Sequence, residues 1–173
     1  MKTAMFALLA AALLSGCKEE LAEAPPPAPL TEESVSFFCQ MEVLGHGGPK
    51  AQIHLEGMPV PLFFAQVRDG MAYMKSPERD ARITATYVSD MGAATSWNEP
   101  GDTNWIKAEE AIFVIEANVA GGMGAPEIVP FRNVPDAEAF VTRYGGRLVG
   151  LEDIPDDVVL AAVDTDTVLE VPE

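Results

Sequence analysis

The fold of this chain is decided by a glycine-rich turn that leads directly into an alternating strand, GHGGPKAQIHL at residues 45–55. The glycines and proline of Gly45–Pro49 are typical of a tight turn, and the residues after them alternate as a strand does. A second glycine-rich turn that ends in proline occurs at Ala120–Pro126, and a short apolar run, Ile128–Phe131, follows it. The chain therefore contains the same pattern twice.

Each glycine-rich turn is expected to join two strands, with a helix and a third strand after them. The predicted strands are 37–43, 50–55, 83–88, 111–115, 128–131 and 147–149, and the predicted helices are 62–75 and 135–144, with one more helical turn in 152–160. This order predicts an α+β fold of two ββαβ pseudo-repeats with antiparallel pairing, spanning 36–90 and 104–150 within one domain, 36–161. Because residue identity between the halves is low, the prediction rests on the order of elements.

Length and charge narrow the class of protein. The chain has 173 residues, of which 48% are hydrophobic, and a net charge of −16 from 11 basic and 27 acidic residues. This apolar content is sufficient for one ordinary folded domain. An acidic surface repels phosphate backbones, so nucleic-acid binding is not expected.

The first residues have the pattern of an export signal. Lys2 precedes an apolar run, 4–14, that is too short to span a bilayer. The sequence LSGC at Leu14–Cys17 resembles a bacterial lipobox, which implies a signal peptide at 1–16 and acylation of Cys17. Lys18 after the cysteine favours the outer membrane among such lipoproteins.

Two segments flank the predicted domain. Residues 17–35 are rich in proline and glutamate and lack apolar periodicity, so we expect an unpacked tether. In polyproline form, residues 18–35 would extend roughly 56 Å at about 3.1 Å per residue. The acidic tail, 162–173, is also expected to be loose.

The cysteine count makes Cys39 a candidate functional residue. Two cysteines and two histidines exclude a zinc site with four such ligands at the usual spacing. If Cys17 carries lipid, Cys39 is the only thiol left in the mature protein. An unpaired thiol in an oxidising compartment is either buried and inert or kept for its chemistry.

Four residues form a candidate copper site. Cys39 and Met41 are two residues apart, which on a strand places both sulfurs on one face. A thiolate and a thioether are soft ligands that select Cu(I). His46 lies in the first glycine-rich turn and Met123 in the second, and related halves would bring these turns together over one metal ion.

Each candidate also has a structural explanation. Cys39 and Met41 could pack in the core, and His46 could be a solvated loop residue, whereas Met123 between glycines is the hardest to explain as core. Residues that we expect to be structural are His54, Met71, Met74, Trp97 and Trp105. No nucleotide-binding or hydrolase motif occurs in the chain.

These motifs together resemble those of the NosL family, the accessory lipoproteins of nitrous oxide reductase. The resemblance rests on Cys39-x-Met41, GHGGPKAQI at 45–53, GGMGAPE at 121–127 and VPF at 129–131. It extends from Cys17 to about Pro155, and the acidic tail lies outside it.

The resemblance implies a periplasmic Cu(I) chaperone, not an enzyme, that works with nitrous oxide reductase and its membrane-bound maturation transporter. It also implies a fold like the core of alkylmercury lyase. Cys39 and Met41 match the family's Cys-x-Met, and His46 and Met123 match its glycine-rich turns. Which of His46, His54 and Met123 completes the ligand set is left open. The alternatives are an enzyme that uses Cys39 with His46 as its base, and a metal-free lipoprotein that binds another protein.

Overall fold

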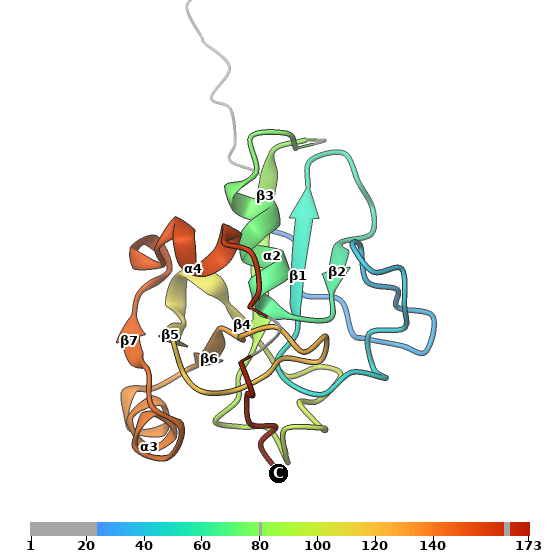
Figure 1. Cartoon of the computed structure of the whole chain (residues 1–173). Helices are drawn as coiled ribbons and strands as arrows, with labels where there is room; N and C mark the ends of the chain where they lie inside the picture. The colour runs from blue at the N-terminus through green and yellow to red at the C-terminus, as the bar shows by residue number, and fades with distance from the viewer. Residues whose placement is uncertain (1–23, 80, 165–166) are drawn as a thin grey trace, which may run out of the picture.

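The structure of the protein is a computed structural model that describes residues 24–79, 81–164 and 167–173 (Figure 1). The predicted signal peptide, the lipidation site Cys17 and the first part of the predicted tether, 18–23, lie outside the described residues. No helix in the described ranges combines the length and the apolar character needed to cross a membrane.

The described chain forms two small antiparallel sheets, with strand orders β2-β1-β3-β4 and β6-β5-β7. The strands are β1 (Ala51–Leu55), β2 (Leu62–Phe64), β3 (Ile83–Ser89), β4 (Trp105–Lys107), β5 (Ile112–Ile115), β6 (Val129–Phe131) and β7 (Arg147–Val149). The helices are α2 (Val67–Lys75), α3 (Val134–Tyr144) and α4 (Asp156–Leu160), with 3-10 turns η2 (Ala108–Glu110) and η3 (Leu151–Asp153). The α+β prediction is confirmed. Apart from β4, each half has the order ββαβ, and its first strand lies at the centre of its sheet.

Strand β1 is buried on both faces. Its Ala51 and Ile53 join the main core cluster together with residues of α2 and of the second sheet. Helix α2 approaches β1 so closely that a Cβ on Gly70 would lie 2.8 Å from the Cβ of Ala51, which explains the glycine within this helix.

The second half is built around β5 and α3. Val114, Phe131 and Ala137 belong to a second core cluster between this sheet and the helix. Asn133 caps α3 by accepting a hydrogen bond from Asp136 N at 3.1 Å, as its position before Pro135 favours. Helices α2 and α4 lie side by side (Figure 1).

Three details of the predicted elements are wrong. Residues 37–43 form a turn with isolated bridges instead of a strand. The predicted helix 62–75 begins at Val67, because Leu62–Phe64 pair with β1 as strand β2. Strand β4 was not predicted; it lies in the expected second half, 104–150, but pairs with β3 of the first sheet.

The described part of the predicted tether is packed on the domain. Gln52 accepts from Ala28 N at 2.8 Å and donates to Ala28 O at 2.9 Å. Tyr87 donates to Pro25 O at 2.7 Å, and Leu30 is buried against Val43 and Phe63. The prediction of an unpacked tether is wrong for these residues. The segment lacks apolar periodicity, but side chains of the sheet satisfy its backbone groups by hydrogen bonds and so hold it in place.

The acidic tail also makes ordered contacts. Glu170 N donates to Asn118 O at 3.0 Å, and Ala120 N donates to Glu170 O at 2.8 Å. Val119 and Glu170 form a parallel bridge, and Pro172 is buried. The expectation of a loose tail from residue 162 onward is therefore wrong for its described end.

Candidate functional site

Cys39 and Met41 lie on a tight hairpin loop. Ser36 N donates to Met41 O at 2.9 Å, and residues 37–39 form the turn between them. Cys39 is unpaired and half-buried, and the side chain of Met41 is 45% exposed. The strand argument for a shared face is wrong, but the loop presents both residues at the surface of the protein.

This loop is fastened to the end of β2. Phe37 N donates to Phe63 O at 2.8 Å, and Ala65 N donates to the Ser36 hydroxyl at 3.3 Å. The Phe38 ring packs edge-on against Phe64, with 5.6 Å between the centroids. The position of Cys39 is thus set by contacts with residues 63–65.

His46 contacts the second glycine-rich turn. Its Nδ1 lies 3.2 Å from the Gly122 carbonyl oxygen, which can only accept, so Nδ1 is the donor of this hydrogen bond and Nε2 is the ring nitrogen left for another partner. A Cβ on Gly122 would lie 2.6 Å from the His46 Cβ and 2.7 Å from Gly47 O. Glycine is required there because the two turns touch.

The Met123 turn is fastened by a buried glutamine. Met123 N donates to Gln66 Oε1 at 2.7 Å, and Gln66 is 2% exposed. The Met123 side chain itself is 40% exposed. The backbone of Met123 is fixed by this hydrogen bond while its side chain is open to solvent, so the thioether is available as a ligand.

The two turns meet for a reason other than the predicted one. The first precedes β1, whereas the second lies in the connection between β5 and β6, so they do not occupy equivalent places in the two halves. Two of the candidate segments are fastened to one short stretch of chain, residues 63–66, which we call the shared base. It holds the Cys39 loop through Phe63 and Ala65 and the Met123 turn through Gln66.

A buried lysine strengthens this base. Lys50 is fully buried, and its Nζ donates to the carbonyl oxygens of His46 at 2.5 Å, Gly47 at 3.0 Å and Ala65 at 3.2 Å. Burial lowers the pKa of Lys50 from 10.5 to about 8, and the negative charge of Glu127 opposes this shift. The ammonium joins the first turn to the shared base.

The second half also contains a buried charged residue, Glu127, which follows the proline of the second glycine-rich turn as Lys50 follows that of the first. Oε1 of Glu127 accepts from Arg68 N at 3.0 Å and from Ile128 N at 2.9 Å, whereas Oε2 has no partner within the described ranges. Burial raises the pKa of Glu127 from 4.5 to about 8, with smaller opposing contributions from these hydrogen bonds and from Lys50.

Lys50, Gln66 and Glu127 are not among the residues predicted for the site. A signal for two of them was present, because Lys50 and Glu127 are charged residues placed directly between a turn proline and a buried strand. Gln66 carried no such signal, since its role depends on contact with a turn 57 residues away.

The residues expected to be structural have structural contacts. His54 is buried, and its Nε2 donates to Gln52 Oε1 at 3.0 Å. Burial lowers the pKa of His54. Met71 and Trp97 are buried in the two core clusters.

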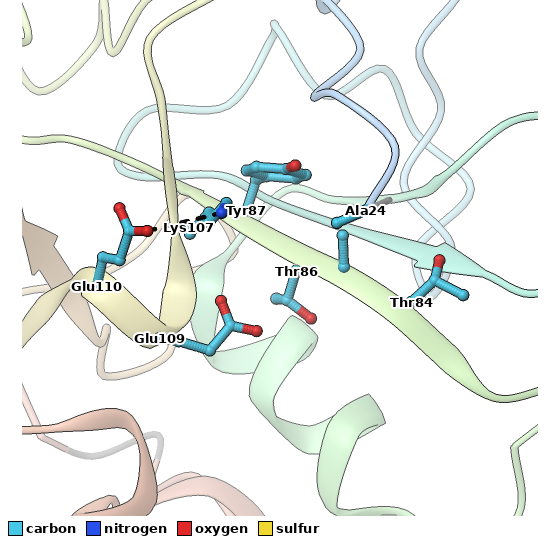
Figure 2. Close-up of a pocket in the computed structure, with 8 residues that line it drawn as sticks. Ala24, Thr84, Thr86, Tyr87, Lys107, Glu109 and Glu110 are labelled. Carbon is cyan, nitrogen blue, oxygen red and sulfur yellow. Dashed lines mark ion pairs between the residues drawn. The ribbon is translucent and has the colours of Figure 1, made fainter. Parts of the chain in front are cut away.

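One cavity lies away from the candidate ligands. It has a volume of about 230 Å³ and lies beside β3 where β4 ends opposite Tyr87 (Figure 2). Its lining residues include Thr84, Thr86, Lys107 and Glu109, and none of the four candidate ligands lines it.

A metal bound by the candidate residues would have to use methionine sulfur. Among residues 24–79, 81–164 and 167–173, no three His, Cys, Asp or Glu side chains converge so as to hold a metal ion. The fold defines a small α+β domain, and its candidate soft ligands Cys39, Met41 and Met123 lie on two segments that are each fastened to residues 63–66.

The chain belongs to the NosL family, whose family model matches residues 27–159. The copper-binding lipoprotein NosL of Achromobacter cycloclastes is 52% identical over 163 residues, which cover 92% of this chain and 84% of the relative. The protein of the same name from Stutzerimonas stutzeri is 29% identical over 153 residues, or 87% of this chain and 78% of the relative.

Solved structures of the family share the fold. The crystal structure of the copper chaperone NosL from Shewanella denitrificans has a TM-score of 0.71 at 29% identity, covering 76% of this chain and 98% of that one. The solution structure of apo-NosL from Achromobacter cycloclastes has a TM-score of 0.50 at 53% identity, covering 66% of this chain and 92% of that one.

Proposed function

We propose that this protein is a lipid-anchored Cu(I) chaperone of the periplasm that supplies copper during maturation of nitrous oxide reductase. The observation that carries the proposal is the shared base, residues 63–66. It fastens both the loop with Cys39 and Met41 and the turn with Met123, and both methionines are exposed. The names of the relatives, copper-binding lipoprotein and copper chaperone, support the same function.

The ligand types favour Cu(I) as the cargo. The Cys39 thiolate supplies the one negative charge, and the thioethers of Met41 and Met123 are soft and neutral. Neutral ligands add affinity without strong electrostatic retention, as a protein that must release its metal requires. Because the methionines are exposed, a sulfur of the acceptor can form a bond to copper before the donor's Cu–S bonds break.

His46 is the fourth candidate ligand. Its Nδ1 donates to a backbone carbonyl, an arrangement common for metal-binding histidines, and this leaves Nε2 as the donor atom for a metal. The alternative of a Cys39-dependent enzyme needs His46 as a base hydrogen-bonded to the Cys39 thiol, whereas the described hydrogen bond of the His46 ring is to Gly122 O in the second turn.

The anchor and the partners belong to the same proposal. Acylation of Cys17 would hold the domain at a membrane, with the outer membrane favoured by Lys18. Nitrous oxide reductase and its membrane-bound maturation transporter are the proposed partners. The docking of Pro25 on Tyr87 limits the reach from Cys17 to eight residues, or about 28 Å at full extension.

The experiment is an anaerobic titration of the protein with Cu(I) against a chromogenic Cu(I) chelator. We expect one equivalent to bind tightly, and X-ray absorption to show a sulfur-dominated ligand shell. Failure to withdraw Cu(I) from even a weak chelator would overturn the proposal. Cys17→Ser should shift the protein into the soluble fraction and leave the Cu(I) stoichiometry at one.

A further inference from the structure

We infer that Gln40, the residue between Cys39 and Met41, is a positioning residue that fixes the geometry of these two ligands before copper binds. The inference rests on the proposed function, because it concerns the same site. It assigns a role to a residue that is neither a candidate ligand nor part of the core.

The backbone of Gln40 has an unusual conformation. Its φ is 58°, in the left-handed region that glycine and asparagine usually occupy. In the described ranges, Glu116 is the one other non-glycine residue with positive φ, at 60°. Such conformations persist only where surrounding interactions stabilise them, and they concentrate at functional sites.

The side chain of Gln40 supplies those interactions. Its Nε2 donates to Phe37 O at 2.6 Å and to Ser36 O at 3.3 Å, while its backbone N donates to Ser36 O at 2.9 Å. The amide is therefore folded back over its own loop. Two carbonyl groups at the start of the hairpin are tied to the residue that separates the ligands.

This arrangement explains why glutamine serves here better than glycine. The left-handed residue sets the direction in which Met41 leaves the turn relative to Cys39. Glycine would adopt the same φ at lower cost but would also allow many other conformations. A loop that is already ordered loses less conformational entropy when it binds a metal, so the Gln40 amide should contribute to Cu(I) affinity.

Two substitutions separate positioning from stability. Gln40→Leu removes the amide and retains the cost of positive φ, so it should lower both the melting temperature and the Cu(I) affinity. Gln40→Gly removes the amide and also that cost, so the melting temperature of the metal-free protein should stay close to the parent's. Its Cu(I) dissociation constant should still rise about tenfold, which corresponds to ~1.4 kcal/mol.

Glu116 provides the matched control. Its φ of 60° is close to that of Gln40, it is exposed, and its carboxylate pairs with Arg147 of β7 at 2.8 Å. Glu116→Gly and Glu116→Leu should change the melting temperature in the same order as the Gln40 pair. Neither should change the Cu(I) dissociation constant by more than about twofold.

The readouts are chelator competition for Cu(I), thermal unfolding without metal, and the spread of Cu–S distances in X-ray absorption. Weaker Cu(I) binding by Gln40→Gly at an unchanged melting temperature, with a broader sulfur shell, supports the inference. Parent-like Cu(I) affinity in Gln40→Gly overturns it and leaves the proposed function intact. If the parent protein binds no Cu(I), the proposed function fails, and the inference fails with it.

Discussion

The two halves of the molecule have the same strand order but contribute to the candidate site in different ways. In the first half, the candidate ligands Cys39, Met41 and His46 all precede the central strand β1. In the second half, Met123 lies after the central strand β5, in its connection to β6. The repeated ββαβ unit is therefore a scaffold, and the segments that carry the ligands are unrelated additions to it.

The comparison extends to the ends of the chain. The N-terminal segment packs on the first sheet through Gln52 and Tyr87, and the C-terminal segment pairs with residues 118–120 of the second half. Each half thus carries one terminal segment, and the second of these pairs directly beside the turn that holds Met123. The difference in ligand supply predicts that substitutions in the first half have the larger effect on copper.

The largest expected effect is on Cys39, the one anionic soft ligand in either half. Cys39→Ser replaces a thiolate by a hydroxyl of similar size on a surface loop, so folding should be retained. Cu(I) affinity should fall by two to three orders of magnitude, or roughly 3–4 kcal/mol. Chelator competition measures the loss, and a folded variant with parent affinity would remove Cys39 from the site.

The next effect tests whether the N-terminal segment is part of the first half. Leu30 is buried against Val43 and Phe63, so Leu30→Ala should lower the free energy of unfolding by about 2–3 kcal/mol. Val35, in the same predicted tether, is 46% exposed, and Val35→Ala should change stability by less than about 0.5 kcal/mol. If the two variants are equally stable in chemical denaturation, the N-terminal segment does not contribute to the stability of the first half and is a passive tether.

Most of the scaffold could be predicted from the sequence, because it depends on local patterns. The strand ending in AQIHL, the β-branched run that became β3 and the helix with Asn133 before Pro135 all carry their signal within a few residues. The pairing of Leu62–Phe64 could not be predicted this way, since its apolar residues fit a helix equally well until β1 lies beside them.

The candidate site was predicted less well than the scaffold. The residue types that suit copper were evident from the motifs. The loop geometry, however, depends on the left-handed conformation of Gln40, and the sequence has no glycine there to indicate a positive φ. Likewise, Gln66 and Lys50 act through contacts with residues distant in the sequence or with backbone carbonyls. Such contacts leave no periodic pattern, because each uses a single polar side chain.

A more gradual effect, spread over several pH units, concerns the buried charges of the two halves, Lys50 and Glu127. Folding raises the pKa of Glu127 from 4.5 to about 8, so the folded state holds this proton more tightly and stability falls as pH rises through that range. Folding lowers the pKa of Lys50 from 10.5 to about 8, so stability rises again with pH above 8.

The metal-free protein should therefore have a stability minimum near pH 8, with slopes of at most about 1.4 kcal/mol per pH unit on either side. Glu127→Gln keeps an oxygen for the Arg68 and Ile128 amides and cannot ionise. The decline on the acid side should disappear in this variant, as measured by denaturant unfolding from pH 5 to 8. A decline that persists unchanged would assign it to other groups.

The smallest expected effect is also the most direct test of the comparison, because each half has an exposed methionine in the connection that follows its central strand. Met123 is 40% exposed in the β5–β6 connection, and Met58 is 44% exposed in the β1–β2 connection. If the halves were functionally equivalent, the two methionines would contribute alike. The shared base instead holds the turn of Met123 through Gln66 and makes no such contact with Met58 among the described hydrogen bonds.

Met123→Leu keeps the volume and the apolar character of the side chain and removes the sulfur. It should weaken Cu(I) binding three- to tenfold, or by about 1 kcal/mol, and leave the melting temperature of the metal-free protein unchanged. X-ray absorption should lose about one sulfur neighbour of copper. Met58→Leu, the matched control, should leave both the affinity and the sulfur count unchanged. If Met123→Leu keeps the parent's affinity and sulfur count, as Met58→Leu should, Met123 has no role in binding, and His46 from the first half becomes the remaining candidate to complete the ligand set.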